Sequence, residues 1–324
     1  MTDDAEAMDR WLRQKGLRTD FTKLGEPWGT ARAKEILGTH EAYPSERGIS
    51  DRAAKLANLR VLDAKTTRET FPGSTANGAK PRSAILVPFS ISFAVPRIDY
   101  EPGAEGGKFI NLKDEPLQVY FPPLGKKLPS QPVVVIEGPF KALSAAANGV
   151  PNAFGICGVD GWHPKGEKTL KLELKKLVAG RDVIFVPDAD AATNAQVAAA
   201  AVGFMDAVKE AGGRPWFAPI PDLGGGKTGA DDFIAAQGAK AFLALPRFGL
   251  DSPEVRDLRA LSLPFDEIGA AVRFEMRHAG DVAHDPVTGE WFEFDGQRWA
   301  RGAAGPFNKM RAVIEGLPRE ADAH

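Results

Sequence analysis

Apolar runs alternate with amphipathic stretches through the middle of this chain, and two of the runs end abruptly in acid. VVVIE at 133–137 and VIFVPDAD at 183–190 begin with Val, Ile and Phe, as strands buried on both faces of a parallel sheet do. Amphipathic or Ala-rich stretches follow these runs, and glycines such as Gly149 and Gly212 mark where the expected helices end. This alternation predicts βαβ units and therefore a parallel sheet.

The central third of the chain is predicted to form four strands and four helices. The strands are expected at 133–136, 153–157, 183–186 and 214–220. The helices are expected at 139–148, 167–178, 193–211 and 230–236, the last one ending before Gly238.

The flanking regions have different patterns. The upstream part predicts a helix at 49–61, a loop at 62–82, strand character at 83–95 with a break or edge at Pro88, and another strand at 117–123. Downstream of a linker after 246, residues 281–299 predict a β-hairpin or meander with turns at Pro286–Gly289 and Asp295-Gly296.

These patterns define the expected fold class and domains. We expect an α/β protein with a four-stranded parallel sheet flanked by helices, an α+β N-terminal lobe that is a candidate for nucleic-acid or nucleotide binding, and a small C-terminal module that contains a hairpin. The expected boundaries are 1–130, 131–246 and 247–324. A length of 324 residues is long for a single domain, which agrees with this division.

Composition excludes several classes of protein. The formal net charge of −2 gives no overall basic signal for nucleic acid, although a local basic face remains compatible with it. The single cysteine, Cys157, excludes a disulfide framework or a zinc ribbon built within this chain. The sequence shows no signal peptide and no apolar run as long as a membrane span, so we expect a cytoplasmic protein.

Three carboxylates follow the predicted strands. Glu137 ends the first strand, and Asp188 and Asp190 follow the third. Ligands of open α/β sheets bind beyond the carboxyl ends of the strands, and residues i and i+2 of an extended chain point the same way. The three side chains are therefore expected to hold Mg²⁺ (or Mn²⁺), which prefers oxygen ligands. The alternative roles are a solvated or helix-capping side chain for Glu137, and one helix-capping and one turn aspartate for the Asp pair.

Other polar residues near the same edge of the sheet have more ambiguous roles. GGGKTG at 224–229 is not a nucleotide P-loop, because Pro221 stands where that motif needs glycine. Lys227 and Lys141 are candidate phosphate contacts, with a solvated surface role as the alternative. His163, in a strand-to-helix loop, is either a substrate contact or incidental.

Four segments together resemble a known family. VVVIEGPFKAL, GVDGWH, VIFVPDADAATN and GADDFIAAQG are similar to the Toprim fold of DnaG-type primases, topoisomerases and nucleases, and more closely to the Toprim-like domain DUF3854 of phage and plasmid primases. The C-terminal segment from Asp266 to Trp299 resembles the D5-type N-terminal region that precedes superfamily 3 helicases.

The resemblance implies a DNA primase of a mobile element that is part of a primase-helicase and uses Mg²⁺ (or Mn²⁺). It implies Glu137, Asp188 and Asp190 as catalytic residues that also bind metal. Asp232 is placed with the metal ligands. Phosphate or nucleic-acid contacts are assigned to Lys141, Asn194, Lys227, Asp231 and His163. Many Toprim proteins have an acid where this chain has Lys141.

The implied partners are a single-stranded DNA template, nucleoside triphosphates and a superfamily 3 helicase in the same or a partner chain, with no membrane. The same carboxylates would also serve a Toprim nuclease, in which water replaces the attacking hydroxyl. A non-catalytic DNA-binding module that positions a helicase is the third alternative. The sequence also leaves open whether the chain is a fragment of a longer primase-helicase or a stand-alone relative.

Overall fold

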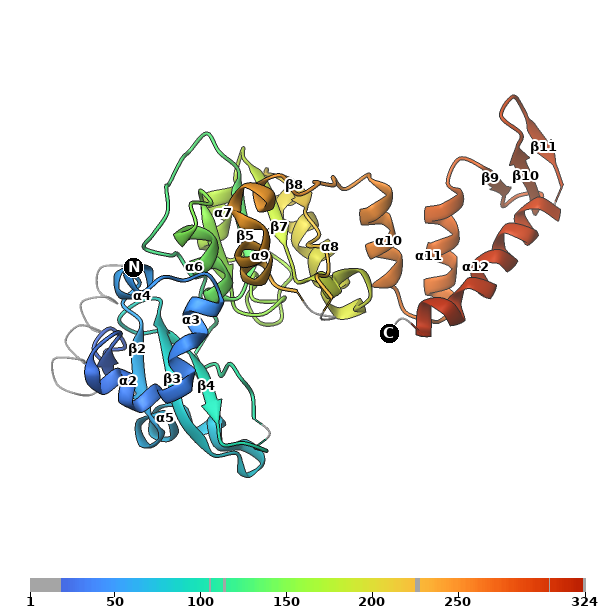
Figure 1. Ribbon diagram of the computed structural model, residues 1–324. Helices are drawn as coiled ribbons and strands as arrows, with labels where there is room; N and C mark the ends of the chain where they lie inside the picture. The colour runs from blue at the N-terminus through green and yellow to red at the C-terminus, as the bar shows by residue number, and fades with distance from the viewer. Residues whose placement is uncertain (1–18, 105, 113–114, 225–227, 303, 323–324) are drawn as a thin grey trace.

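The computed structural model describes residues 19–104, 106–112, 115–224, 228–302 and 304–322. Three parts follow one another along an elongated molecule (Figure 1): an N-terminal lobe (the described residues of 19–112), a parallel-sheet lobe (133–243) and a C-terminal arm (251–322). None of the helices in the described ranges combines the length and the hydrophobicity that crossing a membrane requires.

The parallel-sheet lobe confirms the predicted fold class. Its strands are β5 (Val133–Glu137), β6 (Ala153–Ile156), β7 (Asp182–Val186) and β8 (Arg214–Phe217). They lie in the order β6-β5-β7-β8, and each neighbouring pair is parallel. The helices of this lobe are α6 (Pro139–Ala147), α7 (Leu172–Val178), α8 (Ala195–Glu210) and α9 (Ala230–Leu243), with the short 3₁₀ turn η3 (Ala189–Ala192) before α8.

Both faces of this sheet are buried, which explains the continuous apolar runs. Val134 and Ile136 of β5 belong to a core shared with α6 and α9, whereas Val133 and Val135 belong to a core shared with α7 and α8. Alternate side chains of a strand point to opposite faces, so each face must be apolar when helices cover both.

The N-terminal lobe is built on an antiparallel sheet in the order β1-β2-β3-β4. Its strands are β1 (Glu26–Pro27), β2 (Arg60–Asp63), β3 (Pro81–Pro88) and β4 (Ala94–Tyr100). Its helical segments are α2 (Ala31–Leu37), η1 (Gly38–Ala42), α3 (Tyr43–Glu46), α4 (Asp51–Leu56), α5 (Ala64–Thr70) and η2 (Pro72–Gly78).

The N-terminal lobe and the parallel-sheet lobe share one hydrophobic core. Ile49 and Val87 lie in the same buried cluster as Val134 and Phe140. The Tyr43 ring packs edge-on against Phe140 with 5.4 Å between centroids, and Asn148 donates a hydrogen bond to the Gly48 carbonyl at 2.9 Å. This packing fixes the position of α3 and β4 relative to the end of β5.

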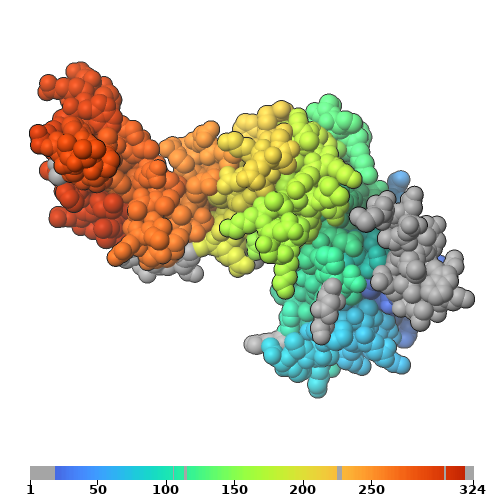
Figure 2. Space-filling view, turned by 180° about the vertical axis from the view of Figure 1, so that it is seen from behind, coloured from blue at the N-terminus to red at the C-terminus, as the bar shows by residue number. Residues whose placement is uncertain are grey.

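The C-terminal arm extends away from the other two parts (Figures 1 and 2). It contains the helices α10 (Pro253–Leu261), α11 (Glu267–His278) and α12 (Ala304–Asp322), and the strands β9 (Val282–Asp285), β10 (Glu290–Phe294) and β11 (Trp299–Arg301). The strands form an antiparallel meander, as predicted. The arm is attached through α10, where Val255 and Leu258 enter the core and Arg259 donates two hydrogen bonds to Asp206 at 2.9 and 3.0 Å.

Several predicted elements were wrong in the N-terminal lobe and the linker. Residues 62–82 are not a loop, because Asp63 accepts a hydrogen bond from the Thr66 amide at 2.7 Å and thereby caps α5. By contrast, the expected strand character of 83–95 with a break at Pro88 is confirmed, because β3 ends at Pro88 and β4 begins at Ala94. The segment 117–123 forms only an isolated bridge, Tyr120 to Gly155, since Pro122 and Pro123 have no amide to donate to a ladder.

Two helix boundaries in the parallel-sheet lobe also differ from prediction. The helix expected at 167–178 begins only at Leu172, because the Lys171 amide turns back to the Trp162 carbonyl at 3.0 Å. The helix expected to end before Gly238 continues beyond it as far as Leu243. Gly238 has a φ of 81° and makes a kink rather than an end. A glycine adopts this backbone conformation without steric cost.

Candidate functional site

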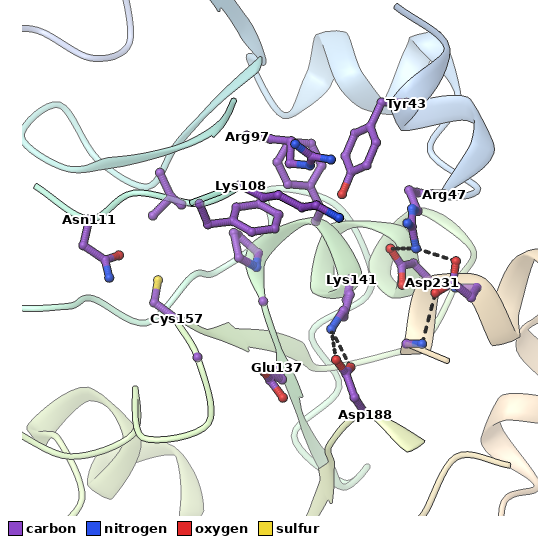
Figure 3. Close-up of a pocket in the computed structure, with 18 residues that line it drawn as sticks. Tyr43, Arg47, Arg97, Lys108, Asn111, Glu137, Lys141, Cys157, Asp188 and Asp231 are labelled. Carbon is purple, nitrogen blue, oxygen red and sulfur yellow. Dashed lines mark hydrogen bonds and ion pairs between the residues drawn. The ribbon is translucent and has the colours of Figure 1, made fainter. Parts of the chain in front are cut away.

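A cavity of about 650 Å³ lies beyond the carboxyl end of β5 (Figure 3). One wall comes from the N-terminal lobe and its following segment, and the other comes from the parallel-sheet lobe. The charged residues that line it are the four cations Arg47, Arg97, Lys108 and Lys141 and the four acids Glu137, Asp188, Asp231 and Asp232. The cavity thus has balanced formal charge.

Glu137 is the last residue of β5 and lines the cavity. The next residue, Gly138, has a φ of 94°, and Pro139 then starts α6. Only glycine takes this backbone conformation readily, so the strand can turn directly into the helix and leave Glu137 at the edge of the sheet. The sequence prediction for the position of this side chain is consistent with its place in the cavity wall.

Lys141 and Asp188 form a buried ion pair at the centre of the site. The Lys141 ammonium donates to both oxygens of Asp188, at 2.5 and 2.6 Å, and Asp188 is only 3% exposed. Burial acts to lower the pKa of Lys141, but attraction to Asp188, Glu137 and Asp231 outweighs it, so the pKa is raised. The ammonium of Lys141 therefore points at a carboxylate. The alternative of a solvated surface lysine would have required it to point into open solvent.

Asp190 is placed differently from Asp188. Asp188 is extended, with φ −65° and ψ 162°, but Asp190 lies inside the 3₁₀ turn η3. The two residues are therefore not in one extended segment, and the expectation that both carboxylates point the same way was wrong in its premise. Asp190 is not among the residues that line the described cavity, whereas Asp188 is.

The paired acids Asp231 and Asp232 lie at the start of α9, and both are bound by Arg47. Arg47 donates to Asp231 at 3.4 Å and also forms an ion pair with Asp232. Asp232 also accepts a hydrogen bond from the Gly229 amide at 3.1 Å, which caps the helix. Burial raises the pKa of Asp231, while Arg47 and Lys141 oppose that rise.

The opposite wall carries cations packed against aromatic rings. The Arg97 guanidinium lies over the rings of Tyr43 and Phe109, with 4.7 and 5.7 Å to their centroids. Phe109 is 45% exposed, and Lys108 beside it is exposed as well. Sequence reasoning missed this wall, because Arg47, Arg97 and Lys108 stand in no recognisable motif. The only signal was the general assignment of a nucleic-acid or nucleotide role to the N-terminal lobe.

Three predicted contact residues are not brought into the cavity or are not described. His163 donates through Nδ1 to the carbonyl oxygen of Pro164 at 2.8 Å, and its Nε2 lies 3.8 Å from Oδ1 of Asp160, outside the cavity lining. Asn194 caps α8 by accepting from the amides of Gln196 and Val197 at 3.1 and 3.3 Å. Lys227 lies outside the described residues.

The described side chains do not form a ready-made metal site. Among the residues with defined placement, no group of three or more His, Cys, Asp or Glu side chains is arranged to hold a metal ion. Both oxygens of Asp188 contact the ammonium of Lys141, and Arg47 contacts both Asp231 and Asp232. A resident divalent ion held by these acids does not fit this arrangement, because Lys141 or Arg47 already pairs with each acid, and the second oxygens of Asp231 and Asp232 accept backbone amides.

Comparison with known proteins identifies similarity for part of the chain. Residues 125–241 match the family model DUF3854, a domain of unknown function. No curated protein matches the sequence.

Three solved structures are similar in fold at low identity. The zinc-binding and RNA polymerase domains of the Aquifex aeolicus primase are 16% identical, with a TM-score of 0.48 over 85% of this chain and 78% of that one. A DnaG primase catalytic domain bound to single-stranded DNA is 15% identical, with a TM-score of 0.45 over 77% and 84%. The E. coli primase catalytic core is 14% identical, with a TM-score of 0.43 over 75% and 84%. Similarity of this degree leaves the activity of the chain to be argued from its own residues.

Proposed function

We propose that this protein is a primase that synthesises primers on single-stranded DNA from nucleoside triphosphates. One observation carries the proposal: Glu137 at the edge of the parallel sheet faces Arg97 and Lys108 across a cavity of about 650 Å³. Concave sites of this size bind small ligands, and cations beside them suit phosphate groups. The DUF3854 match, together with the sequence resemblance to Toprim-like domains of primases, supports this use of the cavity.

The proposed reaction is nucleotidyl transfer. The 3′-oxygen of one nucleotide bonds to the α-phosphorus of the next, the bond from that phosphorus to the bridging oxygen breaks, and pyrophosphate leaves. Glu137 accepts the proton of the attacking hydroxyl as a general base. Arg97 and Lys108 stabilise the negative charge of the phosphates, and the exposed ring of Phe109 offers a stacking surface for a base.

Magnesium or manganese enters this proposal as the counter-ion of the nucleoside triphosphate and is therefore part of the substrate. The assignment of Glu137, Asp188, Asp190 and Asp232 as ligands of a resident metal stays a prediction, from the strand pattern for the first three and from the family resemblance for Asp232. The described arrangement, in which Asp188 and Asp232 pair with Lys141 and Arg47, does not by itself hold such an ion.

We also propose that the C-terminal arm connects this protein to a superfamily 3 helicase of a mobile element, in the same or a partner chain. The motivation is its D5-like sequence and its projecting position (Figure 2), with Phe307 64% and Ile314 52% exposed on α12. Size-exclusion chromatography with a D5-type helicase tests this proposal. Elution as two separate species would contradict a contact between partner chains.

A non-catalytic DNA-binding module is the second candidate function, and the Lys141–Asp188 pair favours it. An aspartate whose two oxygens contact a lysine is less available to a divalent ion than an open one. This candidate predicts that single-stranded DNA binds equally well with and without Mg²⁺, and that no nucleotide is incorporated.

Primer synthesis tests the proposal directly. The protein is incubated with labelled NTPs or dNTPs, single-stranded DNA and Mg²⁺ or Mn²⁺. We expect short products from the wild type and a loss of at least about 100-fold in Glu137→Gln, which removes the base but keeps its shape. Asp188→Ala/Asp190→Ala tests the predicted metal pair, and Glu210→Gln, an exposed glutamate at the end of α8, is the matched control.

The assay also separates the alternatives. Shortening of the DNA by the wild type and not by Glu137→Gln would assign the site to a nuclease. Bound DNA with neither product nor shortening would assign it to the non-catalytic module. Equal primer synthesis by wild type and Glu137→Gln would remove Glu137 from the chemistry.

A further inference from the structure

We infer that Lys141 is the resident cation of this site: its ammonium takes the place beside Asp188 that a divalent ion takes in a metal-binding carboxylate site. The protein then holds no divalent ion at Asp188 before substrate arrives. This inference deepens the proposed function, on which its consequence for the reaction rests. That consequence is that the only divalent ion needed is the one that enters with the nucleoside triphosphate.

The contacts of Asp188 are the first support. One ammonium donates to both carboxylate oxygens, at 2.5 and 2.6 Å, and the aspartate is 3% exposed. A metal ion would need the same oxygens. The metal ion would therefore have to displace the ammonium of Lys141 from the buried carboxylate of Asp188. The displaced ammonium would lose its strongest contact.

The placement of Lys141 on α6 is the second support. Pro139 is the first residue of this helix, so Lys141 lies in the first turn, where the helix dipole is unfavourable for a cation. The position is stabilised by acids instead. Figure 3 shows the ammonium directed at Asp188 with Glu137 nearby, and attraction to both acids raises the pKa of Lys141 although burial lowers it.

The side chain of Lys141 also runs along a backbone that leaves room for it. A Cβ atom added at Gly229 would lie 2.8 Å from Cε of Lys141 and 2.7 Å from Oδ1 of Asp231. Such contacts are too close for any side chain, so the absence of a side chain at Gly229 accommodates the lysine. The ammonium is thus held in a fitted place between α6, β7 and the start of α9.

A second buried lysine shows that burial alone does not produce this arrangement. Lys171 is 7% exposed, and its ammonium donates to the carbonyl of Gly161 at 2.5 Å. Burial lowers the pKa of Lys171. Its partner is a neutral carbonyl, which compensates the buried charge less than a carboxylate does, so the effect of burial is not outweighed as it is at Lys141. Lys141 differs from it by facing acids, which is what a resident cation of an acidic site requires.

Binding of Mn²⁺ to the full chain, without nucleotide or DNA, tests the inference independently of activity. Free Mn²⁺ is followed by electron paramagnetic resonance for wild type, Lys141→Met and Lys171→Met. We expect Lys141→Met to gain one site, with affinity at least about tenfold above wild type, because its removal opens the Asp188 carboxylate. Lys171→Met, the matched control, loses a buried lysine and gains no site.

Two further measurements keep the test decisive. Mn²⁺ should raise the midpoint of thermal unfolding of Lys141→Met and leave that of the wild type unchanged, and Lys141→Met/Asp188→Asn should lose the gained site. Asp188→Asn alone should not change Mn²⁺ binding, which gives a result even if Lys141→Met fails to fold. Stoichiometric Mn²⁺ bound by wild type and lost in Asp188→Asn would overturn the inference.

The outcomes for the inference and for the proposed function are distinct. A protein that makes primers but binds resident Mn²⁺ through Asp188 keeps the function and loses the inference. A protein that makes no primers but gains Mn²⁺ only in Lys141→Met keeps Lys141 as the resident cation and loses the proposed reaction.

Discussion

The two walls of the cavity have opposite charge chemistry and were built in different ways. In the parallel-sheet wall, Asp188 follows a strand and is bound by a lysine of the neighbouring helix. In the N-terminal wall, Arg97 contacts aromatic rings rather than an acid of the opposite wall. Ion pairing therefore fixes the first wall, whereas stacking leaves the charge of Arg97 in the second wall available to a ligand. We expect substitutions in the first wall to affect stability and those in the second to affect binding.

The largest expected effect is on the stability of the parallel-sheet wall. Asp188→Ala leaves the ammonium of Lys141 buried beside fewer acids, and breaking one side of a buried pair costs about 3–5 kcal/mol. Urea unfolding measures the loss. The double variant Lys141→Met/Asp188→Ala should recover a large part of it, and an equal loss in both variants would show that the ion pair is not its cause.

The second expected effect is low reactivity of the single cysteine, which lies in the parallel-sheet wall. Cys157 lines the cavity, and burial raises the pKa of its thiol to about 12. Only the thiolate reacts, so at pH 8 we expect alkylation about a thousandfold slower than for an exposed thiol of ordinary pKa. Iodoacetamide labelling followed by mass spectrometry measures this rate. Rapid labelling that does not speed up in denaturant would contradict the burial of Cys157.

Acid should destabilise the N-terminal lobe through His40. Burial lowers the pKa of His40 to about 4, and its Nε2 has no hydrogen-bond partner among the residues that the structure describes. The unfolded chain takes up the proton near pH 6.5, whereas the folded chain resists it until about pH 4. Stability is therefore full above pH 6.5, is lost as the pH falls towards 4, and decreases by about 1–3 kcal/mol in total.

Substitution of His40 checks this pH dependence. His40→Phe should flatten the fall in unfolding free energy between pH 6.5 and 4, as measured by urea titrations at several pH values. The control is His284→Gln, an exposed histidine of the C-terminal arm, which should keep the wild-type profile. Identical profiles for wild type and His40→Phe would assign the acid sensitivity to other groups.

The smallest expected effect is on nucleotide binding by the N-terminal wall. Arg97→Met removes the guanidinium but keeps an unbranched chain between Tyr43 and Phe109, so it should weaken nucleoside triphosphate binding by about 1–2 kcal/mol. Calorimetric titration with a non-hydrolysable triphosphate measures the change. The midpoint of thermal unfolding should move little, and a large fall with unchanged affinity would reverse the proposed difference between the walls.

The sequence was most informative where the backbone itself carries the pattern. Apolar runs with acid ends predicted β5 and β7 almost to the residue, because a sheet covered on both faces needs continuous apolar strands. The position of Glu137 at an edge of that sheet followed from the same rule. Prediction was poorer for polar segments such as 62–82, where a capping aspartate rather than an apolar period starts the helix α5.

The tertiary structure alone decided which charges meet. Lys141 and Asp188 are 47 residues apart, and Arg47 and Asp231 are 184 residues apart, so no local pattern joins them. The local backbone also decided that Asp190 enters a 3₁₀ turn instead of continuing the extended conformation of Asp188. The sequence by itself determined a parallel sheet with acids at its carboxyl edge, because periodicity and strand direction are local properties. Packing of α3, β4 and α6 decided the cations that face those acids, because side-chain pairing depends on how distant segments dock.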